Sequence, residues 1–444
     1  MSFSSMQAYR GFVIDSPRRG ELREIRDGAL LVEDGIILDC GEYSRIRHLP
    51  EADGLIWQNS PSSLLLPGLI DLHTHLPQYP AVARQESALL PWLEKHIFPL
   101  EKDFTPAVAK KLAPVFFEHL ARSGTTTAGI FTSISKESTE ACFEAAAKSG
   151  MRVIMGKMMM DRGSYGSLAP EKILARSVTE TRSLCETWHR FDKGRIDYAV
   201  SPRFAVTCTT ELMTEAAKLA REFDCYIQTH LSENHEEIQT VKKLFPEHPD
   251  YTSVYAACGL LTPKTFLGHG IHLSPSELEK IKSTGAAIVH CPSSNLFLKS
   301  GIMPLDRWQD ADIPLALGSD VAAGPELNLW RVLRSALESQ VARSFYEEVR
   351  IPSLAELFHL VTQGAAEAIG KGDIIGTLSP GKEADFIVLD LKKLLPAAKR
   401  LSFQDDLSAN DILSLLIHRA DDAATIESFV RGRSVYRAFQ GDLL

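Results

Sequence analysis

The sequence predicts an α/β fold in which a (β/α)₈ barrel is accompanied by a small composite β domain built from both ends of the chain. Two observations carry this prediction. In the central region, short apolar runs alternate with longer segments whose apolar residues recur at helical spacing. Toward both ends, short apolar runs are separated by turns containing glycine, which is typical of antiparallel strands. We therefore expect residues 67–370 to form the barrel and residues 1–66 and 371–444 to form the small β-sandwich domain.

The N-terminal region has the pattern of a small sheet. GFVID at residues 11–15 and ALLVEDGIILDCG at residues 29–41 are strand candidates, and Asp-Gly pairs at 27–28 and 34–35 are expected to mark hairpins. Similar short runs return in GTLSPGKEADFIVLDL and TIESFVRGRSVYRAF near the C-terminus. We expect the two ends to pair into one sheet.

The central region contains eight strand candidates, each followed by a segment of helical or loop character. Eight such units favour a closed parallel barrel. An open doubly wound sheet is the competing fold, but it would be expected to carry a glycine-rich cofactor turn after its first strand, and that turn is missing from the sequence. The candidates span residues 68–75, 125–131, 152–157, 196–201, 225–230, 265–269, 286–291 and 315–320.

The composition of the chain excludes several classes of protein. The 444 residues are 44% hydrophobic and 24% charged, which suits a globular chain and excludes a disordered or fibrous one. The formal net charge of −9 gives no general attraction to nucleic acid or anionic lipid, so we expect neither as a partner. The seven cysteines are odd in number and form no CxxC pair, which argues against a disulfide framework and favours a reducing cytoplasm. Nowhere do 18 apolar residues run together, so we expect no membrane span.

The sharpest local signal is PGLIDLHTH at residues 67–75. His73 and His75 lie two residues apart on a predicted strand, so their side chains project to the same face and could bind one metal ion. Isolated HxH pairs are more often ordinary surface or core histidines. Here, however, His230, His269 and Asp320 lie at the ends of the fifth, sixth and eighth predicted strands, which in a barrel open toward the same mouth.

Imidazole and carboxylate donors without thiolate suit Zn²⁺, one per chain, and Fe²⁺ or Mn²⁺ accept the same donors. An open position on such an ion holds a water whose pKa falls toward neutrality, which predicts metal-assisted hydrolysis. Glu233 follows His230 by three residues and is the candidate proton shuttle. Its competing interpretation is an ordinary glutamate near the start of a helix.

Several motifs together carry a resemblance that spans essentially the whole chain: PGLIDLHTH, THLSEN, LGHGIHLS, VHCPSSN and LGSDVAAG. With these motifs the sequence resembles the amidohydrolase superfamily, in particular its mononuclear aminohydrolase branch. Within that branch it is similar to the guanine deaminases. Three segments carry this closer similarity: LPQYP after the HxH pair, PWLEKHIFPLEKDF at residues 91–104 and SPRF at residues 201–204.

The resemblance implies hydrolytic deamination of guanine to xanthine and ammonia by a homodimer. It implies Glu233 as proton shuttle, Asp320 as base and His269 as the group that polarises water and holds the oxyanion. The implied metal ligands are His73, His75, His230 and Asp320, and the implied substrate contacts are Gln78, Arg203, Phe204 and His230. The chemistry of a guanine lactam agrees, because an amide and a guanidinium match its carbonyl and N–H edge and a phenyl ring can stack on a purine.

Three alternatives stay open. Another mononuclear aminohydrolase or a chlorohydrolase would act on a triazine, a cytosine or an adenosine derivative with the same fold. A binuclear amide hydrolase would need a carbamylated lysine on the fourth strand, and IDYAVSPRF has no lysine. A non-catalytic scaffold on this fold would be expected to lack metal ligands, all of which are present here.

Overall fold

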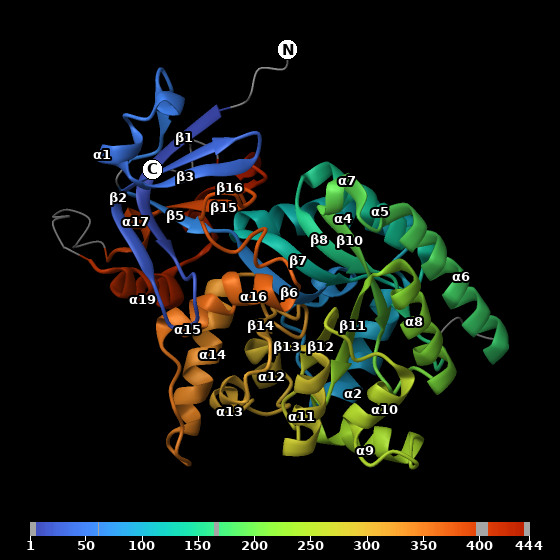
Figure 1. Cartoon of the computed structure of the whole chain (residues 1–444). Helices are drawn as coiled ribbons and strands as arrows, with labels where there is room; N and C mark the ends of the chain where they lie inside the picture. Colours follow the sequence, from blue (N-terminus) through green and yellow to red (C-terminus); the bar gives the residue numbers. More distant parts are fainter. Residues whose placement is uncertain (1–5, 61, 164–167, 397–406, 439–444) are drawn as a thin grey trace.

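The computed structural model describes residues 6–60, 62–163, 168–396 and 407–438. Figure 1 shows the blue N-terminal and red C-terminal elements gathered on one side of the molecule, with the barrel on the other. One sheet has the strand order β17-β16-β15-β5-β1-β2-β3, with β4 paired to β1. The other has the order β14-β13-β12-β11-β10-β8-β7-β6, with β9 paired to β10. The α/β architecture predicted from the sequence is confirmed.

The small sheet joins the two ends of the chain. Antiparallel pairing of β15 with β5 places Phe386 opposite Pro67 and carries the C-terminal strands onto the N-terminal ones. The predicted pairing of the two ends is therefore confirmed. The strands of this sheet are β1 (Met6–Asp15), β2 (Arg23–Glu33), β3 (Ile36–Glu42), β4 (Trp57–Gln58), β5 (Ser63–Pro67), β15 (Phe386–Asp390), β16 (Thr425–Val430) and β17 (Arg433–Arg437).

One of the two hairpins predicted in the N-terminal region is correct. Asp34 and Gly35 have φ angles of 49° and 85° and connect β2 to β3, as an Asp-Gly turn should. The hairpin predicted at Asp27-Gly28 is wrong, because β2 runs through both residues. Gly28 pairs with Gly11 of β1, and a Cβ on Gly28 would lie 2.6 Å from Cγ2 of Val13, so the glycine permits close packing within the sheet.

The barrel strands are parallel and begin within one residue of the predicted positions. The last strand is shorter than predicted: it ends at Leu317, and Asp320, the predicted end, has a φ of 49°, which is outside the extended conformation. The short strand β9 was not predicted. The barrel strands are β6 (Leu69–His75), β7 (Thr125–Phe131), β8 (Arg152–Gly156), β9 (Met158–Met159), β10 (Ile196–Pro202), β11 (Tyr226–Leu231), β12 (Thr265–His269), β13 (Ala287–His290) and β14 (Leu315–Leu317).

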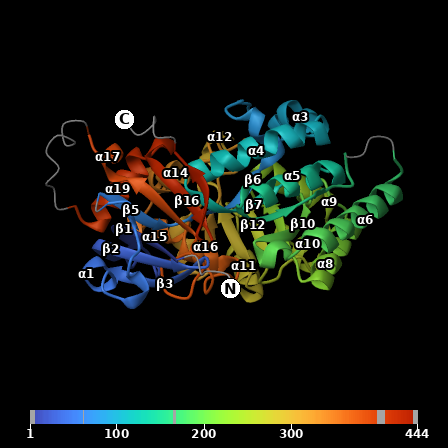
Figure 2. The same ribbon diagram turned by 90° about the horizontal axis from the view of Figure 1, so that it is seen from above.

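Helices cover the outside of the barrel, and Figure 2 shows α5, α8 and α11 around the strands. Local sequence sets their limits: α11 begins with a capping box between Ser274 and Glu277 and ends at Gly285, which adopts the left-handed conformation. The longer helices are α4 (Pro106–Arg122), α5 (Lys136–Ser149), α6 (Pro170–Trp188), α8 (Thr210–Phe223), α9 (His235–Leu244), α10 (Tyr251–Cys258), α11 (Pro275–Thr284), α14 (Leu329–Arg343) and α19 (Ala409–Arg419).

Shorter helical segments connect these elements or line the barrel mouth. They are α1 (Tyr43–Ile46), η1 (Pro50–Ala52), η2 (Leu76–Ala81), α2 (Leu89–Trp92), η3 (Leu93–Ile97), α3 (Phe98–Lys102), α7 (Phe191–Gly194), α12 (Pro292–Phe297), α13 (Leu305–Asp310), α15 (Leu354–His359), α16 (Gln363–Ala368), α17 (Leu391–Leu394) and η4 (Asp422–Ala424). Within the described part of the chain, no helix combines the length and the apolar character needed to cross a membrane.

Candidate metal centre and active site

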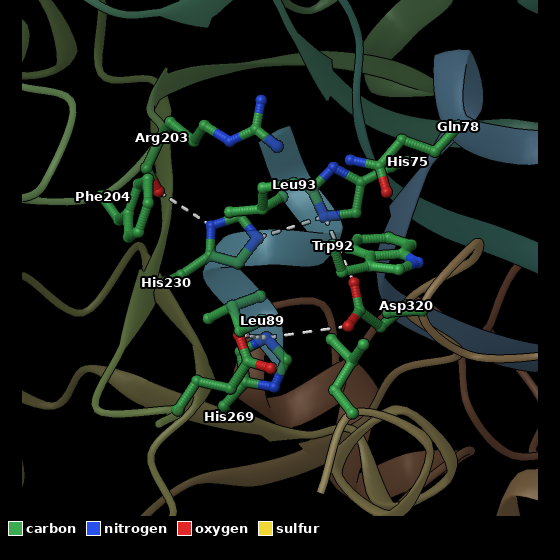
Figure 3. Close-up of a pocket in the computed structure, with 13 residues that line it drawn as sticks. His75, Gln78, Leu89, Trp92, Leu93, Arg203, Phe204, His230, His269 and Asp320 are labelled. Atoms are coloured by element: carbon green, nitrogen blue, oxygen red, sulfur yellow. Dashed lines mark hydrogen bonds and ion pairs between the residues drawn. The ribbon is translucent and has the colours of Figure 1, made fainter. Parts of the chain in front are cut away.

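Five side chains meet at the carboxyl ends of the barrel strands. His73 and His75 close β6, His230 lies in β11, His269 is the last residue of β12, and Asp320 follows the end of β14 by three residues. Figure 3 shows the imidazoles of His75, His230 and His269 facing the Asp320 carboxylate. The structure thus brings together all of the residues that the sequence placed at strand ends, although they are scattered over about 250 positions of the chain.

Ligand atoms from four of these side chains, His73, His75, His230 and Asp320, lie 3.1 to 3.3 Å apart in four pairs. The Nε2 atom of His75 lies 3.3 Å from Nε2 of His73, 3.1 Å from Nε2 of His230 and 3.3 Å from Oδ1 of Asp320. The Nε2 atom of His73 is also 3.3 Å from that oxygen. A regular tetrahedron with 3.3 Å edges has its centre about 2.0 Å from each corner, which is the Zn–N and Zn–O bond length. These four separations are the ones that a tetrahedral divalent cation requires of its ligand atoms.

His269 borders the same centre. A second set of ligand atoms, from His73, His230, His269 and Asp320, lies within 4.8 Å of one another. The Nε2 atom of His269 is 3.7 Å from Oδ2 of Asp320 and 3.4 Å from Oε2 of Glu233, while its Nδ1 pairs with Oδ1 of Asn295 at 2.9 Å. His269 therefore lies between the possible metal ligands and the candidate proton shuttle.

The ionisation states suit metal binding. Burial lowers the pKa of His75 to about 4 and holds the pKa of His230 well below its usual value, so both imidazoles are neutral and keep a lone pair. The Nδ1–H group of His230 donates a hydrogen bond to the backbone oxygen of Arg203 at 2.8 Å. The lone pair on Nε2 is therefore free to bind a metal ion. Burial opposes the ionisation of Asp320, but hydrogen bonds from His73 and His75 outweigh it and hold its pKa well below the usual range. The hydroxyl of Ser294 donates to Oδ2 of Asp320 at 2.6 Å and orients the carboxylate.

Glu233 is buried beside this centre, only 3% exposed. Burial, assisted by the charge of Asp320, raises the pKa of Glu233 to about 8, and the hydroxyl of Ser300 donates to its Oε1 at 2.9 Å. Glu233 precedes α9, whose cap uses Asn234 and Glu237. The carboxyl group of Glu233 therefore does not cap the helix, and it lines the pocket described next.

The four predicted substrate contacts, His230 among them, line the same pocket. Gln78 from η2 and Arg203 and Phe204 after β10 border it together with His75, His230, Glu233, His269 and Asp320. Apolar walls come from Leu89, Trp92, Leu93 and Leu298. These walls, together with Ser294, Asn295, Ser300 and Glu101, were not predicted as site residues. The first three wall residues lie in or next to the segment at 91–104 that carried the family resemblance, but their apolar side chains gave no chemical signal.

The fold and the site define a class of protein. The chain belongs to the amidohydrolase family, whose model matches residues 64–435. It is similar to the guanine deaminase of Escherichia coli (strain K12), with 35% identity over 97% of this chain and 98% of that protein. The structure of guanine deaminase from Bradyrhizobium japonicum superposes with a TM-score of 0.90 at 32% identity, covering 98% of this chain and all of that one. A guanine deaminase from C. acetobutylicum, with guanine bound in its active site, superposes with a TM-score of 0.88 at 28% identity, covering 97% of this chain and 100% of that one.

Proposed function

We propose that this protein is a guanine deaminase that uses one Zn²⁺ per chain. The observation that carries the proposal is that Gln78 and Arg203, an amide and a guanidinium, line the same pocket as the cluster of histidines and aspartate. The similarity to guanine deaminases along nearly the full length of the chain supports it. Fe²⁺ and Mn²⁺ are the alternative occupants of the centre.

The reaction replaces the amine on C2 of guanine with an oxygen atom from water, giving xanthine and ammonia. A bound Zn²⁺, held by His73, His75, His230 and Asp320, would supply the activated water. Glu233 donates a proton to a ring nitrogen as C2 becomes tetrahedral, and a raised pKa suits that role. Asp320 acts as base, and His269 stabilises the negative charge that develops on oxygen. The carbon–nitrogen bond then breaks, and the amine leaves as ammonia with a proton that Asp320 removes from the attacking water, while the proton from Glu233 stays on the ring nitrogen.

Arg203 and Gln78 orient the purine. The guanidinium donates to the ring carbonyl, while the amide pairs with the neighbouring N–H. Phe204 is buried at 4% exposure, and its ring centroid lies 6.2 Å from that of His230, so it can stack on a purine held against the metal centre. Together these contacts place C2 where the water attacks it.

We further propose a cytoplasmic homodimer that binds neither nucleic acid nor membranes. All seven cysteines are free thiols, which suits a reducing compartment. The dimer is implied by the family resemblance and is tested by sedimentation equilibrium of the purified protein.

The function is tested by measuring ammonia release from guanine, adenosine and cytosine, chloride release from a chlorinated triazine, and the metal content of the protein. We expect guanine to have the highest kcat/KM and one equivalent of zinc per chain. Faster turnover of any other member of this panel would overturn the guanine assignment. No turnover by the metal-loaded protein on any of them would favour the non-catalytic scaffold.

A further inference from the structure

A carboxylate that has no assigned role lies between the two residues proposed to read the purine. Glu101 in α3 accepts a hydrogen bond from Nε2 of Gln78 at 2.9 Å on its Oε1 atom. Its Oε2 atom accepts from NH1 of Arg203 at 2.5 Å. All three side chains are buried, with exposed fractions of 2% for Gln78, 2% for Arg203 and 9% for Glu101.

This arrangement determines which way the Gln78 amide points. An ionised carboxylate only accepts hydrogen bonds, so the group of Gln78 that faces Glu101 must be the NH₂. The carbonyl oxygen of Gln78 is then the end left for a ligand. Arg203 carries a permanent charge that needs a counterion when it is buried, and Glu101 supplies it.

The same helix also restrains the guanidinium. The Cζ atom of Arg203 lies 5.1 Å from the ring centroid of Phe98, which begins α3. With NH1 engaged by Glu101, the other N–H groups of Arg203 remain to donate to a ligand. The pocket therefore presents an acceptor from Gln78 and donors from Arg203.

We infer that Glu101 is a positioning residue that sets this hydrogen-bond polarity and thereby selects a lactam over an amino-substituted ring. The inference rests on the proposed function. A lactam offers a ring N–H donor beside a carbonyl acceptor, which matches the acceptor of Gln78 and the donors of Arg203. An amino-substituted ring offers a bare nitrogen beside an NH₂ group, the reverse pattern, and leaves both protein groups unpaired.

Guanine and 2,6-diaminopurine form the matched pair of substrates for a test. Both carry the amine on C2 that the enzyme would remove, and they differ only along the edge that Gln78 and Arg203 would read. The measured quantity is the ratio of kcat/KM for guanine to kcat/KM for 2,6-diaminopurine, because a general loss of stability or metal would not change this ratio.

Glu101→Gln is the principal variant, since a glutamine at this position can donate as well as accept and allows the Gln78 amide to flip. We expect the guanine to 2,6-diaminopurine ratio to fall about tenfold or more with zinc content close to wild type, while Tm falls because the buried Arg203 loses its counterion. Glu101→Asp keeps an acceptor-only group and should keep the ratio within about threefold of wild type, even if both rates fall. Glu94→Gln replaces an exposed glutamate in the adjoining η3 and serves as the control, with no expected change in the ratio.

A double-mutant cycle tests whether Glu101 acts through Gln78. In a Gln78→Leu background, Glu101→Gln should lower the ratio much less than it does alone. If wild-type enzyme prefers guanine and Glu101→Gln leaves the ratio unchanged, the inference fails while the proposed function stands. If Glu101→Gln does not fold, a collapse of the ratio in Glu101→Asp likewise overturns the inference. Failure of the proposed function would appear separately, as wild-type enzyme that turns over neither purine.

Discussion

The backbone N–H of Asp320 donates a hydrogen bond to the backbone oxygen of His73 at 2.7 Å. A second bond, 3.0 Å long, runs from the N–H of His75 to the oxygen of Val321. These bonds close the barrel mouth between the first strand and the loop after the last one. They hold the aspartate and the histidine pair at a fixed separation before any metal arrives, which is the preorganisation that a binding site needs.

The side chain of Asp71 also links the first barrel strand to the loop after the last one. Its Oδ1 atom accepts from the backbone N–H of His73 at 3.1 Å and from that of Ser319 at 3.0 Å. We predict that Asp71→Ala weakens zinc affinity about 10–100-fold, because the two ligand-bearing segments lose their common anchor. Titration of the apoprotein against a competing chelator measures this affinity. His230→Ala, which removes a ligand itself, should lose stoichiometric zinc altogether, and an Asp71→Ala protein with wild-type affinity would contradict the proposed role of Asp71.

Glu233→Gln should retain zinc and purine binding but lower kcat by at least about 10²-fold, because the amide preserves shape and cannot transfer the proton. Steady-state kinetics and xanthine binding by calorimetry separate the two effects. Glu236→Gln is the matched control, since that residue is exposed in the first turn of α9. A near-normal kcat in Glu233→Gln would support the competing interpretation of this residue as an ordinary helix-terminal glutamate.

Arg152 connects the barrel to the small domain. It is 1% exposed, its Nε and NH2 atoms donate to Asp385 at 2.8 and 3.2 Å, and it also pairs with Glu383. We predict that Arg152→Met destabilises the protein by about 3–5 kcal/mol, because it leaves the buried carboxylate of Asp385 without a counterion, while Glu383 keeps its pair with Arg431.

The exposed ion pair of Arg45 with Asp39 provides the comparison for this prediction. Arg45→Met should cost less than about 1 kcal/mol, since solvent screens that pair. Urea unfolding of both variants, followed by circular dichroism, measures the difference. Equal losses of stability would show that burial of the Arg152 cluster does not matter.

The sequence predicted the barrel strands well because each is a short apolar run bounded by turns, and the histidines are visible at their ends. Asp320 was expected to end a strand, yet β14 stops at Leu317. Beyond the strand, the backbone N–H of Asp320 donates to the oxygen of His73, a residue 247 positions away in the chain. No local pattern could reveal such a contact.

Glu101 was not predicted as a site residue because its contacts, too, are distant in the sequence. It lies 23 residues from Gln78 and 102 from Arg203, and its partners become neighbours only when α3 folds over the barrel mouth. The proposed division of the chain at residues 66 and 370 stays a prediction. What supports the first boundary is that β5 ends at Pro67 in the small sheet, while β6 begins the barrel at Leu69.

The last prediction separates substrate recognition from metal binding. Arg203 contacts Glu101 and the pocket through its side chain, whereas it contacts His230 only through its backbone oxygen. Arg203→Met should therefore leave zinc content intact while it removes the donors proposed for the guanine carbonyl. Losing one such buried contact costs about 1–3 kcal/mol, so kcat/KM for guanine should fall about 5–150-fold.

Because Arg203 would position the ring against the reacting water, we expect its loss to affect kcat as well as KM. Arg162→Met provides a control, since Arg162 donates to the backbone oxygens of Ala205 and Cys208 close by but does not line the pocket. Steady-state kinetics with guanine and zinc analysis of both variants provide the measurement. If kcat/KM for guanine were unchanged in Arg203→Met, the purine-reading role of this residue would be wrong, and the metal centre alone would remain to define the chemistry.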